Sequence, residues 1–317
     1  MLIINKIILS INKTDYKYIF IKLFFITILS IKYFILLVKT ILIKNKYRVC
    51  LCTVGKLENN YIKDFVIHYK KYGIDKIFLY DNNDINGERF EEVIYEYIKN
   101  QFVKLFNYRG KVNPQLKIYN HCYRVHYKYY DWLIFYDIDE FIYLKNINNI
   151  KIFLSQKIFN NCKSIYLNWN KHTDNNLLYY ENKSIIERFP ETIKNKKYCL
   201  GKTIIRGNIN TFRTHSIHIL DKRVPKCNGF GKNITLKHLF CQKPDLKYYY
   251  IDHYEYKSTE EFIKKINKGD CTFGYGIRIK LLRIKRYFKF NKITLEKIKL
   301  IENKTGLNLS NYKKKIK

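Results

Sequence analysis

Asp137 and Asp139, two carboxylates one residue apart, carry the strongest chemical signal in this sequence. They follow Trp132–Tyr136, a bulky apolar run whose β-branched and aromatic side chains favour a buried strand. Residues at i and i+2 of an extended segment point to the same side, and two like charges there repel each other unless a cation lies between them. Hard oxygen ligands suit Mg²⁺ or Mn²⁺, which in turn bind phosphate oxygens. The sequence therefore predicts a metal and diphosphate site at the carboxyl end of a strand, with a solvated acidic turn as the alternative.

The residues before this motif predict a regular alternation of strands and helices. We expect strands at Val49–Val54, Lys76–Tyr80 and Phe102–Phe106, and helices at Asn60–Tyr72, Glu88–Asn100 and Pro114–Tyr129. Gly73 follows the first helix at the position where a left-handed residue often ends one. Alternation of this kind indicates right-handed crossovers and a mostly parallel sheet flanked by helices, which is an α/β fold.

Beyond the acidic motif the alternation is looser. We expect strands at Ser164–Trp169, Lys183–Phe189 and Lys202–Arg206, and helices from Ser258 to about Gly269 and from Thr294 to Gly306. The first of these helices begins with a capping box, Ser258-x-x-Glu261. We divide the chain into an N-terminal hydrophobic segment (1–44), an α/β domain (45–290) and a C-terminal helix with a basic tail (291–317).

The N-terminal segment is apolar but carries lysines. Tyr18–Ile43 is dominated by Ile, Leu, Phe and Val, interrupted by Lys22, Lys32 and Lys39. Its least charged part, Leu23–Val38, is shorter than the roughly 20 residues that a clean spanning helix needs. On a helix Lys17, Lys32, Lys39 and Lys22 would fall within an arc of about 140°, which also fits a helix lying in the membrane interface. No small-residue cleavage site follows. We expect a membrane anchor, spanning or interfacial, with a soluble helix as the alternative.

The chain is strongly basic, with 60 Lys and Arg against 27 Asp and Glu and a net charge of +33. Such a charge can indicate nucleic-acid binding. However, Lys, Ile, Asn and Tyr are abundant together, as AT-rich codon usage would produce, and the lysines are scattered along the chain. No zinc-finger or RNA-binding motif is present. We expect no nucleic-acid partner; a basic surface facing acidic lipid headgroups or nucleotide-sugar phosphates fits better.

The eight cysteines include no Cys-x-x-Cys pair. Cys50 and Cys52 lie in an apolar run and would face the same side of a sheet. We expect reduced thiols packed in the core, with a disulfide framework or a metal site as the alternatives.

Several segments stand in a fixed order along residues 49–275. They are CTVGKLENNYIKDFVIHYKKYGIDKIFLYDNND, DWLIFYDIDEF, the pair Asn168–Trp169, IIERF, KTIIRG and HYEYKSTEEFIKKINKG. This series resembles the glycosyltransferases of family 92 and their DUF23-like relatives, a branch of the GT-A fold. The chain departs from the family at Leu57, where Asn is usual, and at 170–176, where a Gly-containing segment is usual.

The resemblance implies roles for residues of these motifs. Asp139 would coordinate the metal, Asp137 would contact the metal or the ribose, and His253 would supply a late ligand. Ordinary turn or structural roles are the alternatives. The residues expected to contact the nucleotide sugar or its phosphates are Thr53, Lys56, Glu58, Asp81, Asp137 and Lys202.

Inverting transfer also needs a carboxylate that takes the proton of the acceptor hydroxyl. Glu255 would project to the same side as His253 in an extended segment, and Asp174 is the other candidate. The resemblance thus implies a membrane-associated glycosyltransferase of inverting type. It would use Mn²⁺ or Mg²⁺ and a UDP-sugar, leaning toward UDP-galactose, and act on a glycan or protein-linked acceptor.

Two other interpretations compete with this one. A non-catalytic basic protein of membrane surfaces or nucleic acids would leave the acidic pair at a strand end unexplained. A nucleotidyltransferase would share the metal but not the late His-Tyr motif. Neither a Walker-type phosphate loop nor a Gly-x-Gly-x-x-Gly motif is present, which argues against P-loop kinases and dehydrogenases.

Overall fold

The computed structural model describes residues 13–112, 114–194, 200–218, 220–235, 244–268 and 276–314 of the chain. The chain forms two compact units, Met1–Lys46 and Tyr47–Lys317. The predicted helix end near Gly269 and three of the cysteines (199, 241 and 271) lie outside the described residues.

The larger unit is built on a ten-stranded sheet with the path β3-β2-β1-β4-β7-β6-β10-β5, and β8 and β9 extend it beside β6. The strands β1 to β4 pair in parallel with one another, β7 runs antiparallel between β4 and β6, and β10 joins β6 in parallel and β5 antiparallel. The predicted α/β class with a mixed sheet is confirmed. The strands are β1 (Val49–Gly55), β2 (Lys76–Asp81), β3 (Val103–Asn107), β4 (Trp132–Phe135), β5 (Glu140–Leu144), β6 (Ser164–Lys171), β7 (Gly201–Arg206), β8 (Lys226–Asn228), β9 (Asn233–Ile234) and β10 (Tyr249–His253).

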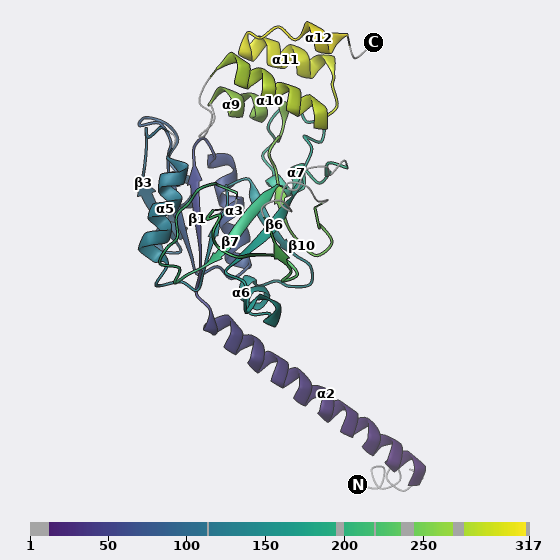
Figure 1. Cartoon of the computed structure of the whole chain (residues 1–317). Coiled ribbons are helices and arrows are strands. Elements are labelled where there is room, and N and C mark those ends of the chain that lie inside the picture. The colour runs from purple at the N-terminus through teal and green to yellow at the C-terminus, as the bar shows by residue number, and fades with distance from the viewer. Residues whose placement is uncertain are drawn as a thin grey trace. The chain divides into compact units, whose positions relative to one another are not determined.

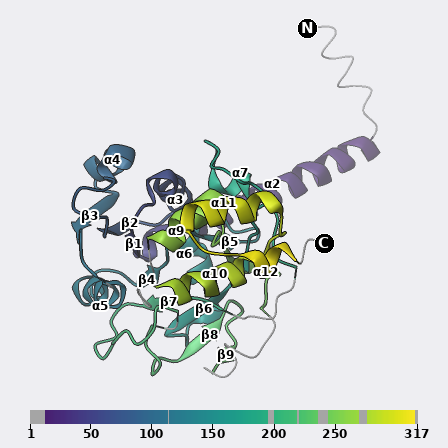
Figure 2. The same cartoon turned by 90° about the horizontal axis from the view of Figure 1, so that it is seen from above.

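Helices cover both faces of the sheet and one of its edges (Figure 1). The helices α3 and α4 bury apolar side chains against one face, and α5 buries its own against the other. A separate apolar cluster joins α9 to α12 beyond the carboxyl ends of the parallel strands (Figure 1, Figure 2). The helices of this unit are α3 (Asn59–Lys71), α4 (Glu91–Lys99), α5 (Gln115–His126), α6 (Ile150–Leu154), α7 (Ile185–Arg188), α9 (Thr259–Asn267), α10 (Ile277–Phe290), α11 (Leu295–Thr305) and α12 (Ser310–Lys313), with a 3₁₀ turn at Lys157–Phe159.

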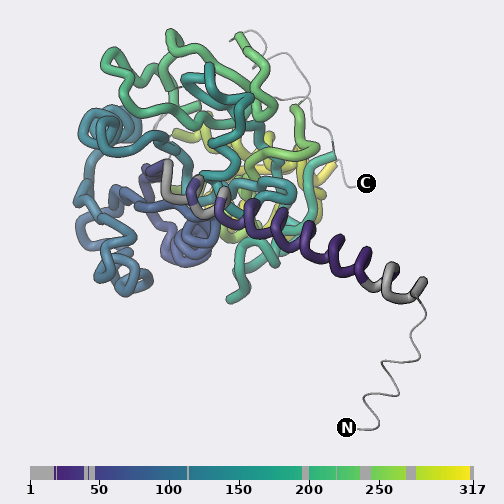
Figure 3. Tube along the Cα trace, turned by 90° about the horizontal axis from the view of Figure 1, so that it is seen from below, coloured from purple at the N-terminus to yellow at the C-terminus, as the bar shows by residue number. Residues whose placement is uncertain are grey.

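The N-terminal unit contains the long helix α2 (Lys13–Lys46), drawn as a tube in Figure 3. Within it, Phe20–Val38 is one span of 19 residues that is long and apolar enough to cross a membrane. Its large apolar side chains are exposed, and they surround the helix instead of following one face. A signal sequence near the N-terminus would have the same length and composition.

The prediction of a strand at Lys183–Phe189 is wrong, because this segment contains the helix α7. Ile185 and Phe189 are both buried, and their spacing of four residues is helical. The side chain of Ser184 accepts a hydrogen bond from the backbone N–H of Glu187 and so caps the helix. These local hydrogen bonds replace the ladder that a strand would have required.

The prediction of reduced core thiols holds for Cys50, Cys52 and Cys122, which are buried and free. It is wrong for Cys162 and Cys227, which form a disulfide with a Cα–Cα distance of 5.9 Å. The cause is the pairing of β8 with β6, which brings the two cysteines together although they are 65 residues apart in sequence. Disulfides persist in oxidising compartments, which suits a secretory lumen or an extracellular location.

Candidate active site

A cavity of about 410 Å³ lies at the carboxyl ends of β1 and β4, beside α9 and α10. Because parallel strands end at the same edge of a sheet, motifs far apart in sequence meet there. The predicted site residues that line this cavity, which we call the donor cavity after the sugar donor that the sequence analysis predicts, are Lys56, Glu58, Asp137, Asp139, His253 and Glu255. Residues that sequence reasoning missed complete the lining, among them Asn82, Gln115, His218, Lys265, Lys268, Arg283 and Arg286.

Asp139 and His253 face each other in this cavity. The antiparallel pairing of β10 with β5 brings the end of β10 next to the acidic motif, where the backbone N–H of Tyr254 donates to the carbonyl of Asp139. Asp139 Oδ1 then lies 3.6 Å from His253 Nε2, and Asp139 Oδ2 accepts a 2.9 Å hydrogen bond from Lys265. Burial alone would raise the pKa of Asp139, but Lys265 and His253 hold it well below its usual range. The carboxylate is therefore ionised and already paired.

Asp137 is held by a different set of partners. Its carboxylate accepts hydrogen bonds from Gln115 at 2.8 Å, Tyr119 at 3.2 Å and Lys202 at 2.8 Å. Lys202 is fully buried beneath Asp137, so it does not line the cavity. Burial raises the pKa of the neighbouring Glu140 well above its usual range, and Glu140 lies 3.6 Å from Lys202.

A metal coordinated by three protein ligands was predicted, and the described residues do not assemble such a set. No three His, Cys, Asp or Glu side chains among them gather closely enough to hold an ion. Asp137 is turned toward Lys202, which leaves Asp139 and His253 as one oxygen and one nitrogen donor in contact. This pair still fits Mg²⁺ or Mn²⁺, because such ions often keep one or two protein ligands and take the rest from phosphate and water.

Glu58 also lines the cavity and is surrounded by lysines. It contacts Lys268 at 2.8 Å and Lys257 at 3.1 Å, and Lys56 contacts Asp84 at 2.8 Å. Burial would raise the pKa of Glu58, but Lys257 and Lys268 lower it. The two ion pairs of Glu58 join the loop after β1 to the start and the end of α9, and the pair Lys56–Asp84 joins it to the loop after β2.

Two predicted nucleotide contacts, Thr53 and Asp81, are buried and do not line the cavity. Asp81 forms a 2.6 Å ion pair with Arg109 and accepts a hydrogen bond from the backbone N–H of Asn83. It therefore fixes the loop after β2, including Asn82 at the edge of the cavity.

Glu255 lines the cavity close to the acidic motif, whereas Asp174 does not. Glu255 accepts a 2.6 Å hydrogen bond from Lys171 and lies 3.5 Å from Arg286. Burial would raise the pKa of Glu255, but Lys171 and Arg286 hold it far below its usual range. Asp174 is buried among the C-terminal helices, where it accepts hydrogen bonds from Tyr287 and, at 2.6 Å, from Lys297. The structure thus gives Asp174 a packing environment instead of access to a substrate.

The spacing of the cations that were not predicted is visible in the sequence. Lys265 and Lys268 are three residues apart in the late motif, so they lie on the same side of α9 and its end. Arg283 and Arg286 repeat this spacing on α10, a helix that was not predicted. Because basic residues are abundant throughout the chain, neither pair stands out in the sequence.

Residues 45–275 match the profile of glycosyltransferase family 92. The chain belongs to this family. The family and the strand order together confirm the expected α/β fold of GT-A type.

Family 92 proteins of plants are similar to part of the chain: one from Ricinus communis is 27% identical over 109 residues, and one from Arabidopsis thaliana is 26% identical over 102 residues. These matches cover 33% and 31% of this chain but only 19% and 17% of the relatives, so the chain spans about a fifth of their length.

Solved structures also resemble this family 92 protein. S. aureus TarS 1–349 in complex with UDP-GlcNAc matches 82% of this chain and 80% of its own, at 12% identity and a TM-score of 0.39. The mannosyltransferase PcManGT from Pyrobaculum calidifontis, in complex with GDP-Man and Mn2+, matches 38% of this chain and 35% of its own, at 10% identity and a TM-score of 0.29.

Proposed function

We propose that this family 92 protein transfers a sugar from a UDP-sugar to a glycan or protein-linked acceptor, with Mn²⁺ or Mg²⁺ as cofactor and inversion at the anomeric carbon. The observation that carries the proposal is the meeting of Asp139, His253 and Lys265 in one cavity at the carboxyl ends of parallel strands. Carboxylate, imidazole and ammonium groups together are suited to a metal-bound diphosphate.

The donor would lie along the row of charged residues that lines the cavity. Asp139 and His253 would hold the metal, which neutralises charge on the leaving diphosphate as a Lewis acid. Lys265 and Lys268 both line the cavity and would bind phosphate oxygens directly. Asn82 and Glu58, at the ends of β2 and β1, would contact the ribose and the uracil.

Glu255 would act as the general base. The acceptor oxygen attacks the anomeric carbon as its proton passes to the Glu255 carboxylate, and the bond from that carbon to the diphosphate oxygen breaks, so that UDP leaves with the bonding electrons. Lys171 and Arg286 keep Glu255 ionised and fix its orientation before the acceptor arrives. Attack from the face opposite the diphosphate gives inversion.

We further propose that α2 anchors the protein in a membrane. A helix with exposed apolar side chains on all sides suits the bilayer core better than its interface, where one polar face would be expected. Lys22 and Lys32 would extend their ammonium groups toward the headgroups.

A screen of nucleotide sugars tests the proposed activity. The full chain in detergent would be incubated with UDP-galactose, UDP-glucose, UDP-GlcNAc and GDP-mannose, with and without Mn²⁺, and the release of the nucleotide measured. We expect a UDP-sugar, with UDP-galactose first among them, to be hydrolysed slowly in a metal-dependent way. Absence of turnover and of UDP binding under all conditions would reject the proposal.

A further inference from the structure

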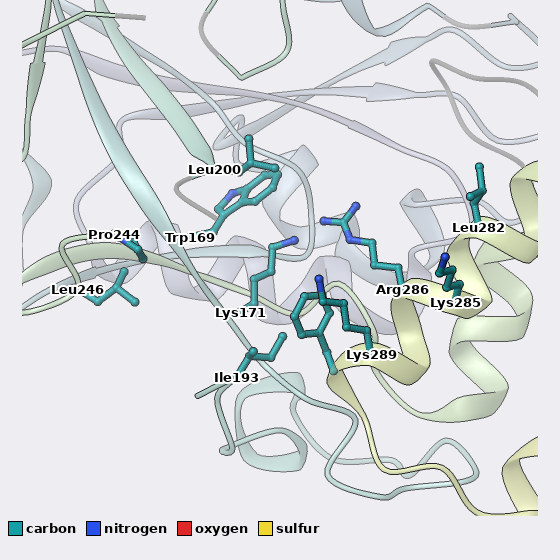
Figure 4. A pocket seen from close by; sticks show the side chains of 11 residues that line it. Trp169, Lys171, Ile193, Leu200, Pro244, Leu246, Leu282, Lys285, Arg286 and Lys289 are labelled. Carbon is teal, nitrogen blue, oxygen red and sulfur yellow. The ribbon is translucent and has the colours of Figure 1, made fainter. Parts of the chain in front are cut away.

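A second cavity, of about 480 Å³, borders the donor cavity. Trp169, Leu200 and Arg286 line both cavities, so the two spaces adjoin at these side chains. Figure 4 shows the second cavity with Trp169 at one wall and the helix α10 at the other. Its volume falls in the range of about 300–1,000 Å³ that is usual for small-molecule sites.

Four cations, Lys171, Lys285, Arg286 and Lys289, line the second cavity, and two of them, Lys171 and Arg286, are paired with Glu255. On α10, Leu282, Lys285, Arg286 and Lys289 follow the spacing i, i+3, i+4, i+7, which places them on one face of the helix toward the cavity. Lys171 reaches in from the end of β6, and Figure 4 shows its ammonium group pointing toward the guanidinium of Arg286. Among the described residues that line this cavity, none carries a carboxylate. Like charges four residues apart destabilise a helix by about 0.2–0.5 kcal/mol per pair, so the pair Lys285 and Lys289 does not stabilise α10.

The remaining wall is apolar and partly aromatic, with Trp169, Ile193, Leu246 and Phe290. Such a wall can pack against the C–H face of a sugar ring, while lysine and arginine bind oxyanions through charge-assisted hydrogen bonds. A saccharide with an acidic group would contact both the apolar side chains and the cations that line the cavity.

We propose that this second cavity is the acceptor subsite and that it selects a saccharide that carries a phosphate or a carboxylate. The inference rests on the proposed transferase function and adds the chemical class of the acceptor. The acidic group would meet Lys285 and Lys289, and the sugar ring would pack on the apolar wall beside Trp169. The accepting hydroxyl would then enter the donor cavity beside Glu255, which Lys171 and Arg286 hold at the boundary.

The test combines binding and transfer with the full chain in detergent. Binding is measured on an array that pairs neutral glycans with counterparts that carry a phosphate or a uronic acid. The variant Lys285→Ala/Lys289→Ala removes two cations of the second cavity that do not line the donor cavity. The matched control is Arg278→Ala/Lys280→Ala, which removes two cations of the same helix outside both cavities.

We expect acidic glycans to bind at least about tenfold more tightly than their neutral counterparts, and the Lys285/Lys289 variant to lose this preference while the control retains it. UDP-sugar hydrolysis without an acceptor should be unchanged in both variants. Equal binding of neutral and acidic glycans, or an acidic preference that survives in the Lys285/Lys289 variant, would overturn the inference.

Glycerol 3-phosphate serves as a soluble counterpart of a lipid headgroup. If it competes as well as the phosphorylated glycan, the cavity recognises phosphate alone and the acceptor assignment is wrong. If no nucleotide sugar is turned over but the array result holds, the proposed function fails and the acidic-glycan site stands.

Discussion

Lys171 donates a 2.6 Å hydrogen bond to the carboxylate of Glu255 at the boundary between the donor cavity and the second cavity. The side chain that holds the proposed base therefore also forms part of the wall of the proposed acceptor subsite. Glu255 lines the donor cavity, and none of the described residues that line the second cavity carries a carboxylate. This relation makes Glu255, and not Asp174, the residue to test first.

Glu255→Gln should lower the rate of transfer by about 10²–10⁴-fold, the range for loss of a general base. The amide keeps the shape of the side chain but cannot take a proton, so the affinity for UDP should remain unchanged. Transfer rates and UDP binding, measured on the same preparations, check both parts. Full turnover in Glu255→Gln would remove the base role from this residue.

Asp174→Asn is the matched comparison, because it makes the same chemical change at the other candidate. It would leave Lys297 buried without its ion-pair partner, so the free energy of unfolding should fall by about 3–5 kcal/mol. The rate of transfer per folded molecule should not change. A large loss of turnover at unchanged stability would reverse the assignment.

Leu57→Asn should stabilise the protein. Leu57 has a φ of +55°, a left-handed conformation that costs a branched residue roughly 1 kcal/mol and that Asn tolerates. The backbone N–H of residue 57 can still donate to Asn83 as it does now. We expect the melting temperature to rise by about 2 °C. Leu57→Ala, which leaves the backbone conformation unfavourable, should give no such gain; an equal gain in both variants would contradict the explanation.

The sequence was sufficient for the first half of the fold and for the centre of the site. The strands from β1 to β4 have short apolar runs and the helices between them have regular apolar spacing, so local pattern and final structure agree. Asp137 and Asp139 come just after the apolar run of β4, so the sequence alone predicts that they lie at the carboxyl end of a strand.

The second half depends on contacts between distant residues that no local pattern reveals. β10 becomes a strand by pairing with β5 and β6, and Cys162 meets Cys227 through the pairing of β8 with β6. Asp174 was a reasonable candidate as an acid after a strand, but its partner Lys297 comes from a helix 123 residues later. Lys265 was not predicted because lysine is abundant in this chain, so no local pattern distinguishes it.

Acid should destabilise the folded chain through His68. Burial lowers the pKa of this imidazole from 6.5 to about 4, although its ring nitrogen is hydrogen-bonded to the carbonyl of Ile142. As the pH falls from about 6.5 to about 4, the unfolded chain binds a proton that the folded chain does not, so stability is lost. Between neutral pH and about pH 5 the loss should be about 2 kcal/mol. Urea unfolding of the wild type and of His68→Gln checks this, since the variant should show a weaker dependence on pH. An identical dependence in both would assign the effect to other groups.

Removal of residues 1–46 should release the protein from membranes and leave the activity intact, because Tyr47–Lys317 is a compact unit by itself. Fractionation of expressing cells and UDP-sugar hydrolysis by the shortened chain measure the two effects. An insoluble or inactive product would mean that α2 is part of the catalytic unit.

The central claim is that Asp139 carries metal-dependent binding of the diphosphate, and calorimetric titration with UDP tests it most directly. The wild type should bind UDP at least about tenfold more tightly in the presence of Mn²⁺, a difference of ~1.4 kcal/mol. Asp139→Asn should lose this gain, and Glu187→Gln, a change at an exposed acid of α7, should keep it. Equal UDP affinity with and without Mn²⁺ in the wild type, or an undiminished Mn²⁺ effect in Asp139→Asn, would contradict the claim.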